Sequence, residues 1–161
     1  MKKICVLLLV ISLVMISISC KKEAVSPEEP EMAKETEAAK EPERITVQHL
    51  LISFKGAIPK PEVIRSREEA EELAAKLLER VKQGEDFDAL VKEFTDDSHP
   101  GIYTMANLEV TPDREKNEFP RAGMVKAFGD VGFSLKVGEI GMTEYDPEAS
   151  KFGWHIIKRL E

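Results

Sequence analysis

The chain has 161 residues, of which 30 are Asp or Glu and 23 are Lys or Arg, so its formal net charge is −7. A protein that binds duplex nucleic acid needs a dense basic face to release the counterions of the phosphates, and this sequence supplies none. We therefore expect no nucleic acid partner. An apolar leader and a polar segment precede residues 44–161, which have the length and composition of one globular domain.

Residues 1–20 are typical of a lipoprotein signal peptide. Lys2 and Lys3 precede an apolar run that is shorter than the roughly 20 residues of a transmembrane helix, as in a secretory signal. The run ends in the sequence SISC, which resembles the lipobox of bacterial lipoproteins. We expect Cys20 to carry the lipid and to anchor the chain to a membrane of the bacterial cell envelope, with the domain outside the cytoplasm. An ordinary cleaved signal is the alternative.

Residues 21–43 are predicted to form a disordered tether. They are rich in Glu, Ala, Lys and Pro and contain no aromatic residue, so they cannot bury enough apolar surface to offset their chain entropy. Both cysteines, Cys5 and Cys20, precede this tether, so the rest of the chain has no thiol. Any chemistry in the domain has to come from other side chains.

The domain begins with a strongly patterned strand and two helices. Residues 45–54, ITVQHLLISF, are β-branched and apolar, which predicts a buried strand with His49 in its middle. Ser66 then starts a helix through a capping box, and Gly84 ends it. Asp86 is expected to cap a second helix with its own apolar face.

The second half of the domain is less regular. Residues 95–101 predict a turn, and residues 102–110 fit either a short strand or an irregular loop. The later predicted elements are a polar surface excursion over 111–123, a short helix over 124–133, and strands over 139–145 and 152–160. In the last strand, alternation places His155 and Ile157 on one face and Trp154 and Ile156 on the other. This order of elements predicts an α+β sandwich.

Four segments in this order resemble the parvulin family of peptidyl-prolyl cis/trans isomerases, over residues 45–160. They are QHLLI around His49, GEDFDALVKEFTDDS from Gly84, MVKAFGDVGFSLKVGEIG from Met124 and SKFGWHIIK from Ser150. The resemblance implies a parvulin/FKBP-like α+β fold, with a small four-stranded, mostly antiparallel sheet and three to four helices packed around it. It also implies rotation about X–Pro bonds without a cofactor.

The same resemblance assigns polar site residues. It implies that His49 and His155 pair in the middle of the sheet, that Ser150 joins their network, and that Asp97 lies in the same site. From the residues alone, two buried histidines are often structural, and Asp96 and Asp97 can merely cap a turn. We expect no metal, because the histidine pair lacks a third ligand of suitable spacing.

The apolar side of the site is also implied by the resemblance. Met124 and Phe128 would form the floor of the proline pocket, although their spacing alone favours core packing. Phe133 is expected in the core or at the pocket edge. The family's GGDLG stretch is replaced by GIYTMANLEV, and this leaves Tyr103 and Leu108, together with Ile102 and Met105, as candidates for the pocket wall.

We expect the substrates to be unfolded or partly folded exported polypeptides that contain X–Pro bonds. The altered GIYTMANLEV segment keeps open the alternative of a non-catalytic chaperone or peptide-binding module with the same fold. Four basic residues of the first loop are spread among prolines and an acidic residue, so we expect no selectivity for phosphorylated substrates; they are Lys55, Lys60, Arg65 and Arg67.

Overall fold

The computed structural model describes residues 40–161. The expected signal peptide, the lipidation site at Cys20 and most of the expected tether lie outside the described residues. Within residues 40–161, no helix is both long enough and apolar enough to cross a membrane.

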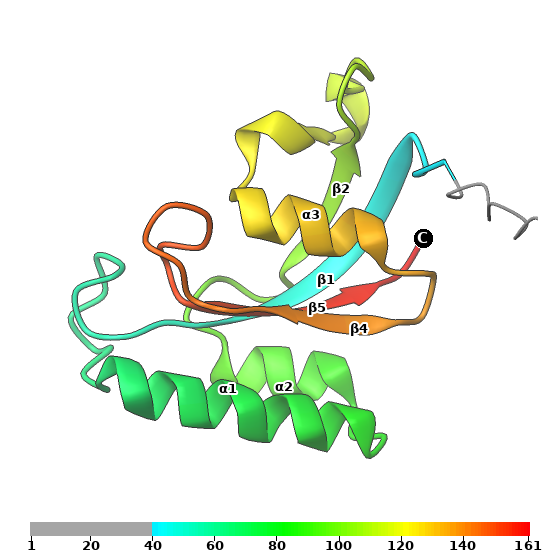
Figure 1. The fold of residues 1–161 in the computed structure, drawn as a ribbon. Coiled ribbons are helices and arrows are strands. Elements are labelled where there is room, and N and C mark those ends of the chain that lie inside the picture. Colours follow the sequence, from blue (N-terminus) through cyan, green and yellow to red (C-terminus); the bar gives the residue numbers. More distant parts are fainter. Residues whose placement is uncertain (1–39) are drawn as a thin grey trace, which may run out of the picture. The chain divides into compact units, whose positions relative to one another are not determined.

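A five-stranded sheet, in the order β3-β2-β1-β5-β4, forms the centre of the domain (Figure 1). The central strand β1 (Arg44–Ile52) pairs antiparallel with β2 (Ile102–Ala106) on one side and with β5 (Trp154–Arg159) on the other. Strand β4 (Ile140–Thr143) pairs antiparallel with β5. Because β1 is covered on both faces, its sequence is a nearly continuous apolar run rather than an alternating one.

The fifth strand corrects the prediction of four strands. Strand β3 (Phe119–Pro120) runs parallel to β2 at the sheet edge, between the short 3₁₀ helices η1 (Arg114–Lys116) and η2 (Arg121–Gly123). It lies in the segment expected to be only a surface excursion. A two-residue strand that contains proline has no periodicity, so the sequence pattern could not reveal it.

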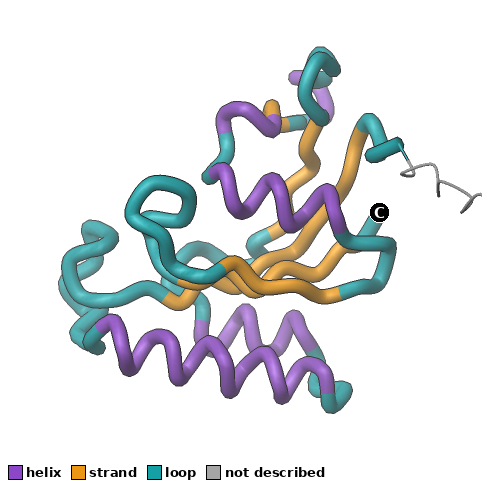
Figure 2. Tube along the Cα trace, viewed as in Figure 1, coloured by secondary structure: helices purple, strands orange, loops and turns teal. Residues whose placement is uncertain are grey.

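Helices cover both faces of the sheet. The helices α1 (Arg67–Lys82) and α2 (Phe87–Phe94) lie on one face, and α3 (Lys126–Ser134) lies on the other (Figures 1 and 2). The predicted capping box is confirmed, because Glu69 N–H donates to Ser66 Oγ over 3.1 Å and Ser66 N–H donates to Glu69 Oε2 over 2.7 Å. Three helices packed on the two faces of one sheet form the predicted α+β architecture.

Alternation along β5 divides the core into two clusters. Trp154 and Ile156 pack with Leu50 against α1 and α2, whereas Ile157 packs with Val47 against α3. The predicted two faces of this strand are confirmed. His49 and His155 lie on the α3 face, where both imidazoles contact the ring of Phe128.

Candidate active site

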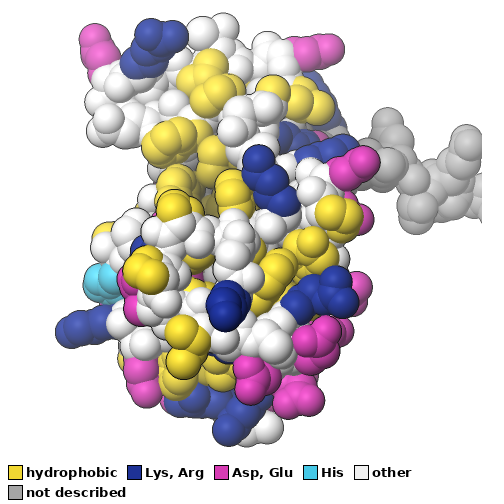
Figure 3. Space-filling view, turned by 90° about the vertical axis from the view of Figure 1, so that its left-hand side faces the viewer, with side chains coloured by type: hydrophobic (Ala, Val, Ile, Leu, Met, Phe, Trp, Pro, Cys, Tyr) yellow, Lys and Arg dark blue, Asp and Glu magenta, His cyan; other side chains and the backbone are white. Residues whose placement is uncertain are grey.

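A cavity of about 450 Å³ opens beside the start of α3. Hydrophobic side chains gather where the molecular surface is hollowed on this side (Figure 3). The lining comes from strands, three loops, the segment before α3 and α3 itself: His49, Leu51, Ile58, Pro59, Lys60, Asp96, Asp97, Tyr103, Met124, Val125, Phe128, Phe152 and His155. These residues are distant in sequence, so the site exists only in the folded chain.

A chain of polar contacts forms the floor of the cavity. His49 Nδ1 lies 3.3 Å from His155 Nδ1, and His49 Nε2 lies 3.1 Å from Asp97 Oδ2. The hydroxyl of Tyr103 donates to the same carboxylate oxygen over 3.1 Å. Both histidines are buried, whereas the Asp97 side chain is 38% exposed, so the carboxylate is the member of this chain that faces the open side.

The hydrogen bonds assign the tautomers of the two histidines. A carboxylate only accepts, so Nε2 of His49 carries the proton that points to Asp97. In neutral His49, Nδ1 is then an acceptor, and Nδ1–H of His155 donates to it. The remaining nitrogen, Nε2 of His155, is buried and has no hydrogen-bond partner within residues 40–161. In this tautomer it is an acceptor, which is less costly to leave unpaired than a charged group.

Burial and neighbouring groups shift the pKa values of three side chains in the site. Burial, with a smaller effect from nearby His49, lowers the pKa of His155 to about 3, so this imidazole is neutral at physiological pH. The hydrogen bond from His49 lowers the pKa of Asp97, and the Tyr103 hydroxyl adds to this effect. Burial raises the pKa of Tyr103, and Asp97 raises it further. The site therefore presents the ionised carboxylate of Asp97 beside the neutral imidazole of His155 and the neutral phenol of Tyr103.

Aromatic edges form the apolar wall. The ring of Phe128 lies 5.1 Å from that of His49 and 5.5 Å from that of His155, in both cases edge to face. Tyr103 approaches His49 at 5.2 Å and Phe128 at 6.0 Å. Met124 lines the cavity from the extended segment before α3, which begins at Lys126. The expected placement of Met124 on the helix is thus corrected, although it still reaches the cavity.

Ser150 reaches the histidines only through the backbone. Its hydroxyl lies 3.2 Å from that of Thr143 and donates to the carbonyl of Gly153 over 2.8 Å. Thr143 Oγ1 in turn accepts from the backbone N–H of His155 over 3.1 Å. Ser150 therefore supports the strand that carries His155 rather than touching an imidazole, and Thr143, which the sequence did not single out, is the intermediate.

Four candidate pocket residues are absent from the cavity lining: Ile102, Met105, Leu108 and Phe133. Leu108 is 57% exposed and is absent from the cavity lining, because β2 ends at Ala106 and the chain leaves the sheet there. Phe133 is buried in the core, one of the two positions expected for it, and does not line the cavity. It follows Phe128 by five residues, which turns it roughly 140° away around the helix.

Asp96 has more than the turn-capping role expected for it. Its carboxylate accepts from the backbone N–H of Ser53 over 2.7 Å and pairs with the guanidinium of Arg65. Arg65 also donates to the carbonyl of Ser53. Asp96 thus fixes the end of β1 to the turn that presents Asp97, and Arg65 does not belong to a purely solvated loop.

Lys60, from the same loop as Arg65, lines the cavity and donates to the backbone carbonyl of Asp97 over 3.2 Å.

Among residues 40–161, no three His, Cys, Asp or Glu side chains gather in a way that could hold a metal ion. The expectation of a site without metal stays a prediction.

The chain belongs to a family of peptidyl-prolyl isomerase domains, because residues 30–161 match the family model described as "PPIC-type PPIASE domain". The parvulin resemblance inferred from the four motifs is therefore confirmed at the level of the family.

Two relatives agree with this family assignment. The chain is 34% identical to "Chaperone SurA" of Pseudomonas aeruginosa over 73% of its own length and 24% of that protein. It is 35% identical to "Foldase protein PrsA 4" of Bacillus cereus, over 62% of this chain and 31% of the relative. The chain thus spans only about a quarter to a third of these relatives.

The fold is likewise shared with solved structures. The structure titled "Peptidyl-prolyl isomerase ESS1 from Candida albicans" matches with a TM-score of 0.53 and 25% identity, over 74% of this chain and 63% of that one. The "Solution structure of the TbPIN1" matches with a TM-score of 0.55 and 24% identity, over 74% and 98% of the two chains.

Proposed function

We propose that this domain catalyses cis/trans isomerisation of X–Pro bonds in polypeptides. One observation carries the proposal: an open cavity of about 450 Å³ combines an apolar wall, formed by Met124 and Phe128, with the polar floor of His49, Asp97 and Tyr103. This combination fits a proline ring held against a nearby imide group. Membership of the isomerase domain family supports the assignment.

The reaction requires only a modest lowering of its activation barrier. Amide resonance opposes rotation with a barrier of roughly 18–20 kcal/mol, and the uncatalysed reaction takes tens to hundreds of seconds. No covalent bond has to break, so the enzyme needs only to bind the twisted imide more tightly than either planar form. Lowering the barrier by about 4 kcal/mol corresponds to roughly a thousandfold acceleration.

Both the apolar and the polar side of the cavity help the protein to bind the twisted imide more tightly than the planar forms. Met124 and Phe128 bury the proline ring and exclude water from the imide. As resonance is lost, the carbonyl carbon of the imide becomes more positive, and the ionised carboxylate of Asp97 stabilises it electrostatically. His49 and Tyr103 orient this carboxylate through their hydrogen bonds. His155, and Ser150 through Thr143, hold His49 and its strand in position.

We further propose that the substrates are unfolded or partly folded exported polypeptides. The relatives are called a foldase and a chaperone, and the sequence begins with a predicted lipoprotein signal. Lipidation at Cys20 would hold the domain on a membrane outside the cytoplasm, because two or more acyl chains give stable anchoring. Labelling with a radioactive fatty acid, compared between the natural chain and Cys20→Ala, tests this anchor.

A second candidate function is peptide binding without catalysis, which the name of the chaperone relative favours. Nuclear magnetic resonance exchange spectroscopy on a short X–Pro peptide separates the two. An isomerase produces cis/trans exchange cross-peaks at substoichiometric protein, whereas a binding module shifts the peptide resonances without such peaks. Absence of exchange despite binding would overturn the enzymatic proposal.

A further inference from the structure

An exposed aromatic ring continues the wall of the cavity. Phe119, in β3, is 43% exposed, and its ring lies 5.5 Å from that of Tyr103, edge to face. Tyr103 itself lines the cavity and touches Phe128. The three rings therefore form a continuous aromatic ledge from the expected proline pocket to the edge of the sheet.

Partly buried polar contacts hold Phe119 in place. The preceding residue, Glu118, has a side chain only 3% exposed, and Arg44 Nε donates to both of its carboxylate oxygens over 3.1 Å. The backbone N–H of Asp113 donates to Glu118 Oε2 over 2.7 Å. Phe119 also pairs with Met105 in the parallel ladder. The ring is exposed although its backbone is firmly anchored.

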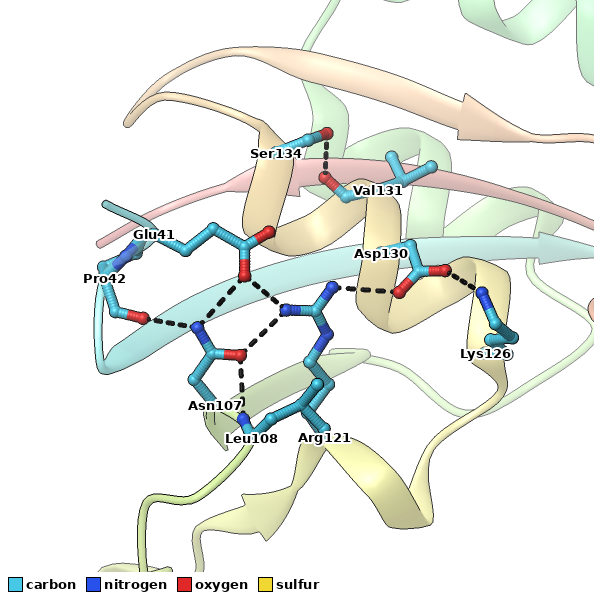
Figure 4. A network of polar contacts seen from close by, with 9 residues as sticks. All are labelled: Glu41, Pro42, Asn107, Leu108, Arg121, Lys126, Asp130, Val131 and Ser134. Carbon is cyan, nitrogen blue, oxygen red and sulfur yellow. Dashed lines mark hydrogen bonds and ion pairs between the residues drawn. The ribbon is translucent and has the colours of Figure 1, made fainter. Parts of the chain in front are cut away.

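The residue after β3 provides a second anchor. Arg121, whose side chain is only 11% exposed, donates to Asn107 over 2.8 Å, to Glu41 over 2.6 Å and to Asp130 over 2.9 Å (Figure 4). It thus ties the segment that carries Phe119 to the chain before β1 and to α3. These contacts on both sides fix the backbone that carries the exposed ring, so a bound chain does not have to pay the entropy of ordering this segment.

We propose that Phe119 forms a subsite for a large apolar side chain of the substrate, two or three residues from the proline. The inference rests on the proposed isomerase function. The separations of 6.0 Å from Phe128 to Tyr103 and 5.5 Å from Tyr103 to Phe119 set the span. Because the three rings need not lie on one line, the two separations together give the upper limit of the span. An extended chain advances about 3.3 Å per residue, so this limit lies between roughly three and four residues, and a position two or three residues from the proline falls within it. The aromatic ledge continues directly from the cavity. A polypeptide whose proline lies in the cavity would therefore reach the ledge with its neighbouring residues.

The test uses the full chain and X–Pro peptides with Leu or Ser at each of the three positions on either side of the proline. We expect kcat/KM to be about fivefold higher with Leu at one position two or three residues away, mainly through a lower KM. Phe119→Ala should remove this preference, and Phe119→Leu should retain most of it. Val137→Ala, which alters an exposed residue outside the cavity lining, should leave it unchanged.

Two outcomes would overturn the subsite. Either the natural chain isomerises Leu and Ser peptides equally at every position, or the preference survives in Phe119→Ala with an unchanged melting temperature. Kd values of the same peptides, measured in parallel, report the preference for Leu over Ser independently of catalysis. If no peptide is isomerised, the proposed function fails, while a Leu preference in Kd that Phe119→Ala abolishes still supports the subsite.

Discussion

His49 and His155 meet as diagonal neighbours on the central strands, with their Nδ1 atoms 3.3 Å apart. In the register of β1 and β5, His49 lies opposite Ile157 and His155 lies opposite Leu51. Same-face residues that are offset by two positions lie within reach of long and aromatic side chains. The register of the two strands therefore sets the contact between the imidazoles and, through His49, the position of the Asp97 carboxylate.

The neutral state of His155 predicts a dependence of stability on pH. Its folded pKa of about 3 lies below the ordinary value of 6.5, so between these values the unfolded chain binds a proton that the folded chain does not. The contribution to stability is complete above pH 6.5 and is lost as the pH falls towards 3. We expect the free energy of unfolding, measured with urea, to decline by up to about 1.4 kcal/mol per pH unit between pH 6 and pH 4.

The matched variant is His155→Gln, which cannot titrate. Its slope over the same pH range should be shallower than that of the natural chain, whatever its absolute stability. The depressed pKa of Asp97 acts in the same direction, but only below the ordinary Asp value of about 3.9, so it leaves this window almost untouched. Equal slopes for the two proteins would show that His155 is not held neutral by the fold.

The charge of Asp97 should matter more than its shape. Asp97→Asn keeps an oxygen that accepts hydrogen bonds from His49 and Tyr103 but removes the negative charge. We expect kcat to fall at least about tenfold while KM changes little, because the charge acts on the twisted imide. Asp88→Asn is the control, since Asp88 is an exposed carboxylate outside the cavity lining that also contacts a histidine. Equal kcat values for Asp97→Asn and the control would limit Asp97 to a structural role.

The contacts of Arg121 should stabilise the domain measurably. Arg121→Met removes three polar contacts of a nearly buried guanidinium, and its Cζ atom also lies 4.7 Å from the centre of the Phe133 ring. We expect a loss of about 1–2 kcal/mol in the free energy of unfolding, discounted because Glu41 and Asp130 are almost half exposed.

Lys126→Met is the control for this variant, because Lys126 pairs with the same carboxylate of Asp130 but its side chain is 78% exposed. It should cost no more than about 0.5 kcal/mol. Equal losses for the two variants would mean that Arg121 acts as an ordinary surface charge.

Periodicity made most of the fold predictable from the sequence. The apolar run around His49 and the alternation around His155 each predicted a strand with a histidine inside it, and the capping box at Ser66 predicted the start of α1. These features are local, so the residue types alone reveal them. The pairing of two strands 106 residues apart followed from the family resemblance rather than from spacing.

The irregular segments were not predictable in the same way. Strand β3, the outward position of Leu108 and the contacts of Asp96 with Ser53 and Arg65 depend on tertiary pairing between loops. Such segments carry no hydrophobic period, and a carboxylate in a turn has the same local sequence whether it faces water or a buried N–H group. The loop residues that line the cavity, such as Pro59 and Phe152, were missed for this reason.

The most direct test of the central claim is a protease-coupled assay on an X–Pro peptide with the full chain and with Phe128→Leu, each first shown to be folded by circular dichroism. The natural chain should accelerate the slow cis-to-trans phase in proportion to its concentration, and Phe128→Leu should lower kcat/KM at least about tenfold. A slow phase that the natural chain leaves unchanged, or equal acceleration by both proteins, would contradict the assignment of this cavity as the site of proline isomerisation.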